Sequence, residues 1–69
     1  MYTVYDFVDD FFLDSTNQPM AIYDRAVDGY VWEGSAIWEI PDRYRSCEML
    51  GMAGLDNGVV EMSIDTNKY

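Results

Sequence analysis

The sequence predicts an α+β fold in which an N-terminal amphipathic helix packs on a small four-stranded antiparallel sheet made of two hairpins. Apolar residues recur at helical spacing over the first dozen positions, and strand-like stretches then flank two turn signals, Asp28-Gly29 and Asn57-Gly58. One helix stripe and one sheet face can close a small core against each other. We therefore expect residues 1–69 to form a single acidic α+β domain.

The first segment has the spacing of one helix face, at positions i, i+3, i+4, i+7 and i+8. Its apolar residues are Val4, Phe7, Val8, Phe11 and Phe12. Thr3 is the expected N-cap, with Asp6 three residues later in a capping-box position. The turn-forming residues 15–19 predict that the helix ends by about Asp14.

The first hairpin is expected to pair residues 20–24 with residues 30–38, both rich in β-branched and aromatic side chains. Gly34 interrupts the second stretch and is typical of a bulge or bend. Tyr30, Trp32 and Trp38 share one face if the strand is unbroken, whereas a bulge at Gly34 moves Trp38 to the other face. Both arrangements remain open, with core packing favoured for Trp32 and Trp38.

The second hairpin is expected to pair residues 47–55 with residues 59–65 across Asn57-Gly58. Before it, residues 42–45 can form one helical turn after Pro41. Residues 66–69 resemble a frayed tail. The methionines of this half are expected to fill core gaps, with an exposed binding patch as the alternative; they are Met49, Met52 and Met62.

Composition indicates a compact fold without the disulfides or metal sites that stabilise many small domains. The chain is 49% hydrophobic, has one cysteine and has no histidine. A disulfide within the chain and a zinc site are therefore excluded, and Cys47 is expected in the core. The unpaired thiol and the absence of a signal-like N-terminus favour a reducing cytoplasm.

The formal net charge of −9 limits the partners that the protein can bind. Residues 1–39 contribute −7 and residues 40–69 contribute −2, so most of the negative charge belongs to the first half. Direct nucleic-acid binding requires cations that displace counterions from phosphates, and anionic membranes repel such a chain. We therefore expect neither nucleic acid nor membrane as a direct partner.

Catalysis and metal binding are both disfavoured by the residue types present. Without histidine, a general base must be a carboxylate or a tyrosine, and Cys47 or a serine lacks its usual partner. A carboxylate pair across strands, such as Glu33 with Glu61, is the remaining candidate for catalysis, but so short a chain has little volume for a cleft. The acidic turns show only fragments of a calcium loop. We expect no enzyme, no metal and no cofactor.

The net charge of −9 is larger than solubility usually requires, because small domains typically carry a net charge of magnitude about 2–8. Carboxylates three or four positions apart on a helix lie about 5–6 Å apart, comparable in order to successive phosphates of a nucleic-acid strand. In size, pI of about 4.1 and an acidic helix set against a small sheet, the chain resembles phage and mobile-element inhibitors that mimic nucleic acid, including anti-CRISPR proteins. Residues 21–24 (AIYD), 31–34 (VWEG) and 40–44 (IPDRY) are also similar to small uncharacterised proteins of bacterial mobile elements.

This resemblance implies an inhibitor that acts in the host bacterial cytoplasm and blocks the basic groove of a defence complex, a CRISPR effector first, as a monomer or weak dimer. The residues expected to face that groove are Asp6, Asp9, Asp10, Asp14, Asp24, Asp28 and Glu33, with Tyr30 as an aromatic anchor. Further candidate anchors are Tyr2, Tyr5 and Trp32. The alternative is a non-catalytic interaction or regulatory module of a mobile element that binds through an aromatic sheet face.

Overall fold

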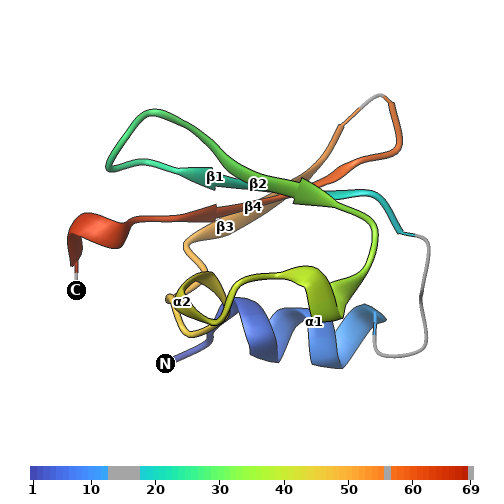
Figure 1. Ribbon diagram of the computed structural model, residues 1–69, viewed down its shortest axis with the longest axis horizontal. Helices are drawn as coiled ribbons and strands as arrows, with labels where there is room; N and C mark the ends of the chain where they lie inside the picture. The colour runs from blue at the N-terminus through green and yellow to red at the C-terminus, as the bar shows by residue number, and fades with distance from the viewer. Residues whose placement is uncertain (13–17, 56, 69) are drawn as a thin grey trace.

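The computed structural model describes residues 1–12, 18–55 and 57–68, with the side chains of Phe12, Ile37 and Lys68 outside that description. A helical layer lies against one face of a twisted sheet, and the other face of the sheet is open (Figure 1). The elements in chain order are α1 (Val4–Phe12), β1 (Met20–Asp24), β2 (Gly29–Gly34), the 3₁₀ turn η1 (Ile37–Glu39), α2 (Asp42–Arg45), β3 (Gly51–Gly54), β4 (Val60–Ile64) and the 3₁₀ turn η2 (Thr66–Lys68). The predicted α+β class is confirmed.

The prediction of an all-antiparallel sheet is wrong, because the four strands form a mixed sheet in the order β2-β1-β4-β3. Both predicted hairpins are present, β1 with β2 and β3 with β4. They join through a parallel pairing of β1 with β4, in which Ile22 lies opposite Met62. These two side chains are 0% exposed. The centre of the sheet thus holds the more buried strand of each hairpin, β1 from the first and β4 from the second.

Helix α1 begins at the predicted capping box. The Thr3 backbone N–H donates to Asp6 Oδ2 at 3.0 Å, and the Asp6 backbone N–H donates to Thr3 Oγ1 at 3.2 Å. Val4, Phe7 and Val8 are buried against the sheet as their spacing predicts. Phe11 lies on the same stripe but is 66% exposed, so the core covers only the first two turns of the helix.

The irregularity in β2 lies at Val31 rather than at Gly34. Tyr30 pairs with Tyr23 and Trp32 pairs with Ile22, so Val31 is the additional residue of a bulge. Tyr30 and Trp32 therefore point to opposite faces of the sheet, and Trp32 packs partly against the core. Gly34 is needed for a different reason: a Cβ at this position would lie 2.6 Å from Cζ2 of the Trp32 ring.

Three further expectations are wrong, concerning Trp38, the end of the chain and Met52. Trp38 is 62% exposed on η1 and does not belong to the core. The end of the chain is not frayed as far as it is described, because Thr66 starts η2 and its hydroxyl donates to Asp24 Oδ2 at 2.7 Å. Met52 is 54% exposed although Met62 is fully buried. Cys47 is buried, as predicted, although it precedes β3 rather than forming part of it.

Candidate acidic binding surface

The outer side of α1 carries three carboxylates, Asp6, Asp9 and Asp10, in one sector of the helix. At 3.6 residues per turn these positions fall within an arc of about 100°. Val4, Phe7 and Val8 occupy the opposite side and hold the helix against the sheet, so the sector faces solvent. Asp9 and Asp10 are exposed and Asp6 is half-buried. We call Asp6, Asp9 and Asp10 the α1 acidic sector.

Two members of the α1 acidic sector are held in place by neutral donors. The Tyr2 hydroxyl donates to Asp10 Oδ2 at 2.8 Å, across eight residues of sequence. Asp6 accepts the Thr3 backbone N–H, and this bond, followed by one with the Thr3 side chain, lowers the pKa of the Asp6 carboxyl. Neither donor carries a positive charge, so these hydrogen bonds orient both carboxylates without neutralising them; the charge of the N-terminal ammonium also contributes to the lowered pKa of Asp6.

The arginines of the helical layer are engaged away from this sector. The Arg43 guanidinium lies over the Tyr44 ring, 4.8 Å from its centroid. Arg45 pairs with Asp42 at 3.5 Å and donates from Nε to the Ile40 carbonyl oxygen at 2.9 Å. Within the described part of the chain, no residue of the α1 acidic sector forms an ion pair.

A second acidic group lies on the open face of the sheet, on the far side from α1. Tyr23 and Tyr30 pack edge to face with their ring centroids 5.5 Å apart. The Tyr30 hydroxyl donates to Glu61 Oε2 at 2.5 Å, and the Tyr23 hydroxyl donates to Asp28. Those carboxylate bonds, together with burial, raise the pKa of Tyr30 and of Tyr23. Glu33 lies opposite Ala21 on the same face.

The structure thus divides the predicted acidic surface into two. Asp6, Asp9 and Asp10 come together on α1. Asp28, Glu33 and Tyr30 lie on the opposite face of the molecule, so one flat groove cannot contact both groups. Asp14 lies outside the described residues.

Asp24 was wrongly predicted to face a partner, because its side chain is only 2% exposed. Its carboxylate accepts hydrogen bonds from the Ala26 backbone N–H at 2.9 Å and from the Thr66 backbone N–H at 3.1 Å. Burial raises the pKa of the Asp24 carboxyl, but these bonds and the one from the Thr66 hydroxyl outweigh it and leave the pKa below its ordinary value. Asp24 is a structural carboxylate that fastens η2 to the β1–β2 turn.

Sequence reasoning missed Tyr23, which was not predicted as part of any site. It named Tyr2 as a candidate anchor and Glu61 as a possible partner of Glu33, but it did not predict that Tyr2 bonds to Asp10 or that Tyr30 bonds to Glu61. Glu61 alternates with the buried Met62, so the strand pattern could have placed it on the open face. The Tyr2–Asp10 and Tyr30–Glu61 bonds join residues far apart in sequence and left no local signal.

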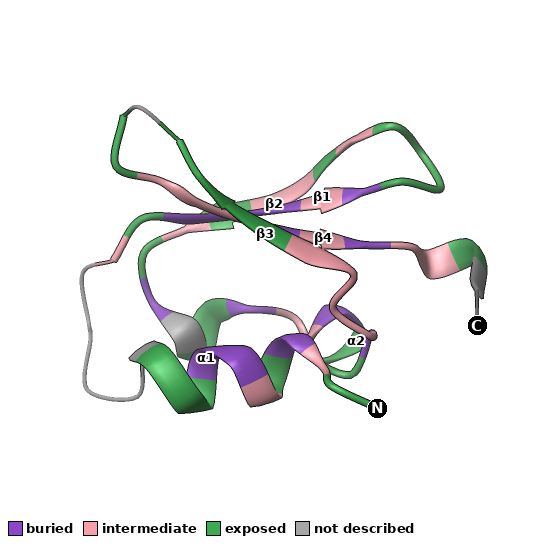
Figure 2. Ribbon diagram, turned by 180° about the vertical axis from the view of Figure 1, so that it is seen from behind, coloured by how far each residue is buried: buried purple, intermediate pink, exposed green. Residues whose placement is uncertain are grey.

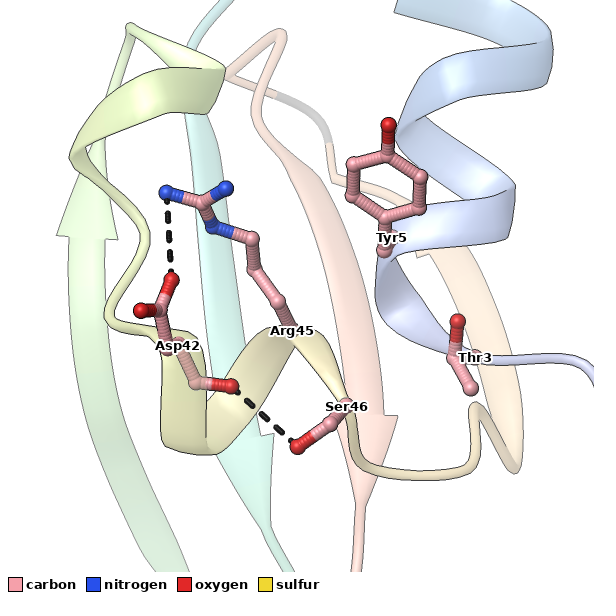
Figure 3. A pocket seen from close by; sticks show the side chains of 5 residues that line it. All are labelled: Thr3, Tyr5, Asp42, Arg45 and Ser46. Carbon is pink, nitrogen blue, oxygen red and sulfur yellow. Dashed lines mark hydrogen bonds and ion pairs between the residues drawn. The ribbon is translucent and has the colours of Figure 1, made fainter.

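A shallow hollow of about 400 Å³ lies between α1 and α2, lined by Thr3, Tyr5, Asp42, Arg45 and Ser46 (Figure 3). The guanidinium of Arg45 turns toward Asp42 inside this hollow, and the Ser46 hydroxyl donates to the Asp42 carbonyl oxygen at 3.2 Å. Its polar groups are thus satisfied largely within the protein. Among the described residues no three carboxylate or cysteine side chains gather as metal ligands, and no described helix is long and apolar enough to cross a membrane.

Comparison with known proteins adds no relative. No family model, no curated protein and no solved structure matches the chain.

Proposed function

We propose that this protein is a non-catalytic inhibitor that places the α1 acidic sector in the basic groove of a nucleic-acid-binding defence complex and excludes the nucleic acid by competition. A CRISPR effector is the first candidate target, in line with the resemblance of character to anti-CRISPR proteins. The target chemistry is a channel lined by lysine and arginine, which binds a row of fixed negative charges as it binds phosphates.

The observation that carries this proposal is the outward position of Asp6, Asp9 and Asp10, none of which forms an ion pair with an arginine or a lysine in the described part of the chain; the N-terminal ammonium acts on Asp6 alone of the three. Carboxylates that served solubility alone could form ion pairs with nearby arginines without any loss of function. Here Arg43 stacks on Tyr44 and Arg45 binds Asp42 instead. The negative potential of the sector is therefore retained, and it steers a basic partner toward α1.

Orientation of the carboxylates by neutral groups also favours recognition. Tyr2 fixes Asp10, and Thr3 fixes Asp6. Binding orders flexible side chains at a cost of about 0.5–1.5 kcal/mol for each, and side chains already fixed in the free protein avoid part of that cost. The sector thus resembles the regular charges of a backbone more closely than mobile surface acids do.

The test compares two charge reversals that differ only in location. Asp9 and Glu33 are both exposed, and neither side-chain carboxylate accepts a hydrogen bond from another described residue. Asp9→Lys lies in the α1 acidic sector, and Glu33→Lys lies on the open sheet face. We expect Asp9→Lys to weaken capture of a basic complex from bacterial lysate by about tenfold, equal to about 1.4 kcal/mol, and Glu33→Lys to leave it nearly unchanged.

The capture is also expected to fall steeply as salt is raised, because exposed charges are screened beyond about 8 Å at physiological ionic strength. Equal binding by wild type and Asp9→Lys would refute the role of α1.

A second candidate function is supported by the Tyr23–Tyr30 pair on the open sheet face. Tyr30 is 50% exposed, and interface hot spots are often aromatic. Trp32 cannot belong to this surface, since the bulge at Val31 turns it toward the core. If the protein is instead an interaction module that binds through this face, Tyr30→Ala and Glu33→Lys will reduce partner capture more than Asp9→Lys does.

A further inference from the structure

The two edges of the sheet are protected very differently. Strand β2 carries a bulge at Val31 and the charged side chain of Glu33, and both features hinder the pairing of another strand. Strand β3 has the sequence Gly-Met-Ala-Gly, with no charge, no proline and no register shift against β4. Three of its four residues are exposed. Figure 2 shows most of β3 in the green of exposed residues.

The backbone groups that β3 leaves unpaired can be assigned from its register. The Leu55 backbone N–H donates to the Val59 carbonyl oxygen at 2.9 Å. Bonded positions alternate along an antiparallel ladder, so Ala53 and Gly51 turn toward β4, and Met52 and Gly54 turn their N–H and C=O groups to the open edge. Before β3 the backbone is already hydrogen-bonded to the N-terminal segment, because the Met49 backbone N–H donates to the Tyr2 carbonyl oxygen at 2.8 Å.

We propose that β3 is a dimerisation edge at which a second copy of this chain adds its own β3 in antiparallel orientation, giving a continuous eight-stranded sheet. A two-fold axis perpendicular to the sheet at Ala53 places Met52 of each copy opposite Gly54 of the other. These are the positions with outward backbone groups, so each facing pair exchanges both hydrogen bonds. The space beside Gly54 is open, with no atom within 4 Å of where its Cβ would be, and it can receive the Met52 side chain.

The absence of charge on β3 favours a second copy over a basic partner at this edge. Strand β3 has no ionisable side chain, so it offers a basic strand no complementary anion, and two copies meet there without facing carboxylates. The flanking carboxylate on β4, Glu61, lies opposite Ala53. Across the dimer the two Glu61 residues would be three strand spacings apart, about 14 Å, which exceeds the Debye length of about 8 Å at physiological salt.

The paired edge is short, about 13 Å for four residues, so the dimer is weak, with a Kd in the micromolar to millimolar range. Each copy carries a net charge of −9, so the overall repulsion must be screened before the edges meet. Salt therefore strengthens this dimer. The same axis keeps both α1 helices on one side of the sheet, and the dimer presents two α1 acidic sectors in the same direction.

The experiment measures the mass of the purified protein alone by sedimentation velocity, from about 10 µM to about 1 mM and at low and high salt, over which the Debye length falls from about 30 Å to about 8 Å. We expect a dimer whose population rises with concentration and with salt. Met52→Glu should weaken dimerisation at least about tenfold, because it sets two carboxylates diagonally across the new strand pair. An equimolar mixture of Met52→Glu and Met52→Lys should form a heterodimer, which also shows that the variants are folded.

Val27→Glu is the matched control, since Val27 is 62% exposed in the β1–β2 turn and Met52 is 54% exposed, and both changes add one negative charge. It should leave the dimer intact. A protein that stays monomeric at about 1 mM, a dimer that salt dissociates, or equal effects of Met52→Glu and Val27→Glu would each overturn the proposal. No partner enters this test, so its outcome is independent of the proposed inhibitory function.

Discussion

Replacing Asp24 by asparagine is expected to destabilise the fold by about 1–3 kcal/mol, because a buried carboxylate that accepts charge-assisted bonds becomes a neutral amide. The three donors are the backbone N–H of Ala26 at 2.9 Å, the backbone N–H of Thr66 at 3.1 Å and the Thr66 hydroxyl at 2.7 Å. Asparagine has the same shape and keeps one oxygen, and the Thr66 hydroxyl can rotate to accept from the new amide. The stability lost in Asp24→Asn is thus mainly the extra strength that the negative charge gives to these hydrogen bonds.

Asp24→Ala is expected to cost more, about 3–5 kcal/mol, since it leaves buried donors without an acceptor. A domain of this length is typically stable by roughly 3–10 kcal/mol, so this variant will be partly unfolded at room temperature. Thr66→Val removes one donor only and should cost about 1–2 kcal/mol. Glu33→Gln, on the exposed surface, is the control and should stay within about 0.5 kcal/mol of wild type.

The effect of Asp24 depends on pH with a definite sign. Its pKa in the folded protein lies below the ordinary value of 3.8, so the ionised carboxylate favours the folded state. That contribution is present above the unfolded pKa and is lost as pH falls through the folded pKa. The stability difference between wild type and Asp24→Asn should therefore be full at about pH 7 and should shrink below about pH 4.

Urea denaturation followed by circular dichroism at a series of pH values measures these free energies of unfolding. The reasoning is refuted if Asp24→Asn matches wild type at neutral pH, or if their difference stays constant into acid. Either result would mean that Asp24 does not hold η2 against the β1–β2 turn as an ionised acceptor.

Other parts of the structure give further predictions. Gly34→Ala should lower the free energy of unfolding by about 1–3 kcal/mol, because the new methyl group would meet the Trp32 ring at 2.6 Å; denaturant unfolding measures it. Glu61→Gln should lower the raised pKa of Tyr30 toward 10.0, seen as earlier tyrosinate absorbance in an alkaline titration, and should lessen the stability lost above about pH 10. Cys47 should alkylate at least about tenfold more slowly in the folded protein than in denaturant, since burial raises the pKa of its thiol.

Matched controls separate these effects from general damage. Gly51→Ala should be nearly neutral, because no atom lies within 4 Å of the added methyl group. Asp28→Asn should lower the raised pKa of Tyr23, whose hydroxyl donates a hydrogen bond to Asp28, and should leave the pKa of Tyr30 largely unaffected. A Gly34→Ala variant as stable as wild type would contradict the close approach of the Trp32 ring.

The fold could be predicted from sequence wherever the signals were local. The Thr3–Asp6 capping box, the Asp28-Gly29 turn and the Asn57-Gly58 turn each involve neighbouring residues, and each predicted element formed around them. The way in which the two hairpins join was not predicted, since it depends on packing Ile22 beside Met62, 40 positions away in the chain.

The candidate site, too, could be predicted only where the sequence signals were local. Helical periodicity predicted that Asp6, Asp9 and Asp10 share one side of α1. The burial of Asp24 could not be predicted, because its partner Thr66 lies 42 residues later and belongs to a segment expected to fray. The bulge at Val31 has no strong sequence signal, whereas the visible signal, Gly34, reflects the packing of Trp32.

The central claim is that the α1 acidic sector takes the place of a nucleic-acid backbone. Its most direct test is displacement of a fluorescently labelled DNA from a purified CRISPR effector by increasing amounts of this protein, followed by fluorescence anisotropy. Wild type and Glu33→Lys should release the DNA at similar concentrations, and the double variant Asp9→Lys/Asp10→Lys should require at least about a hundredfold more. Release of the DNA by the double variant at the wild-type concentration would contradict the claim.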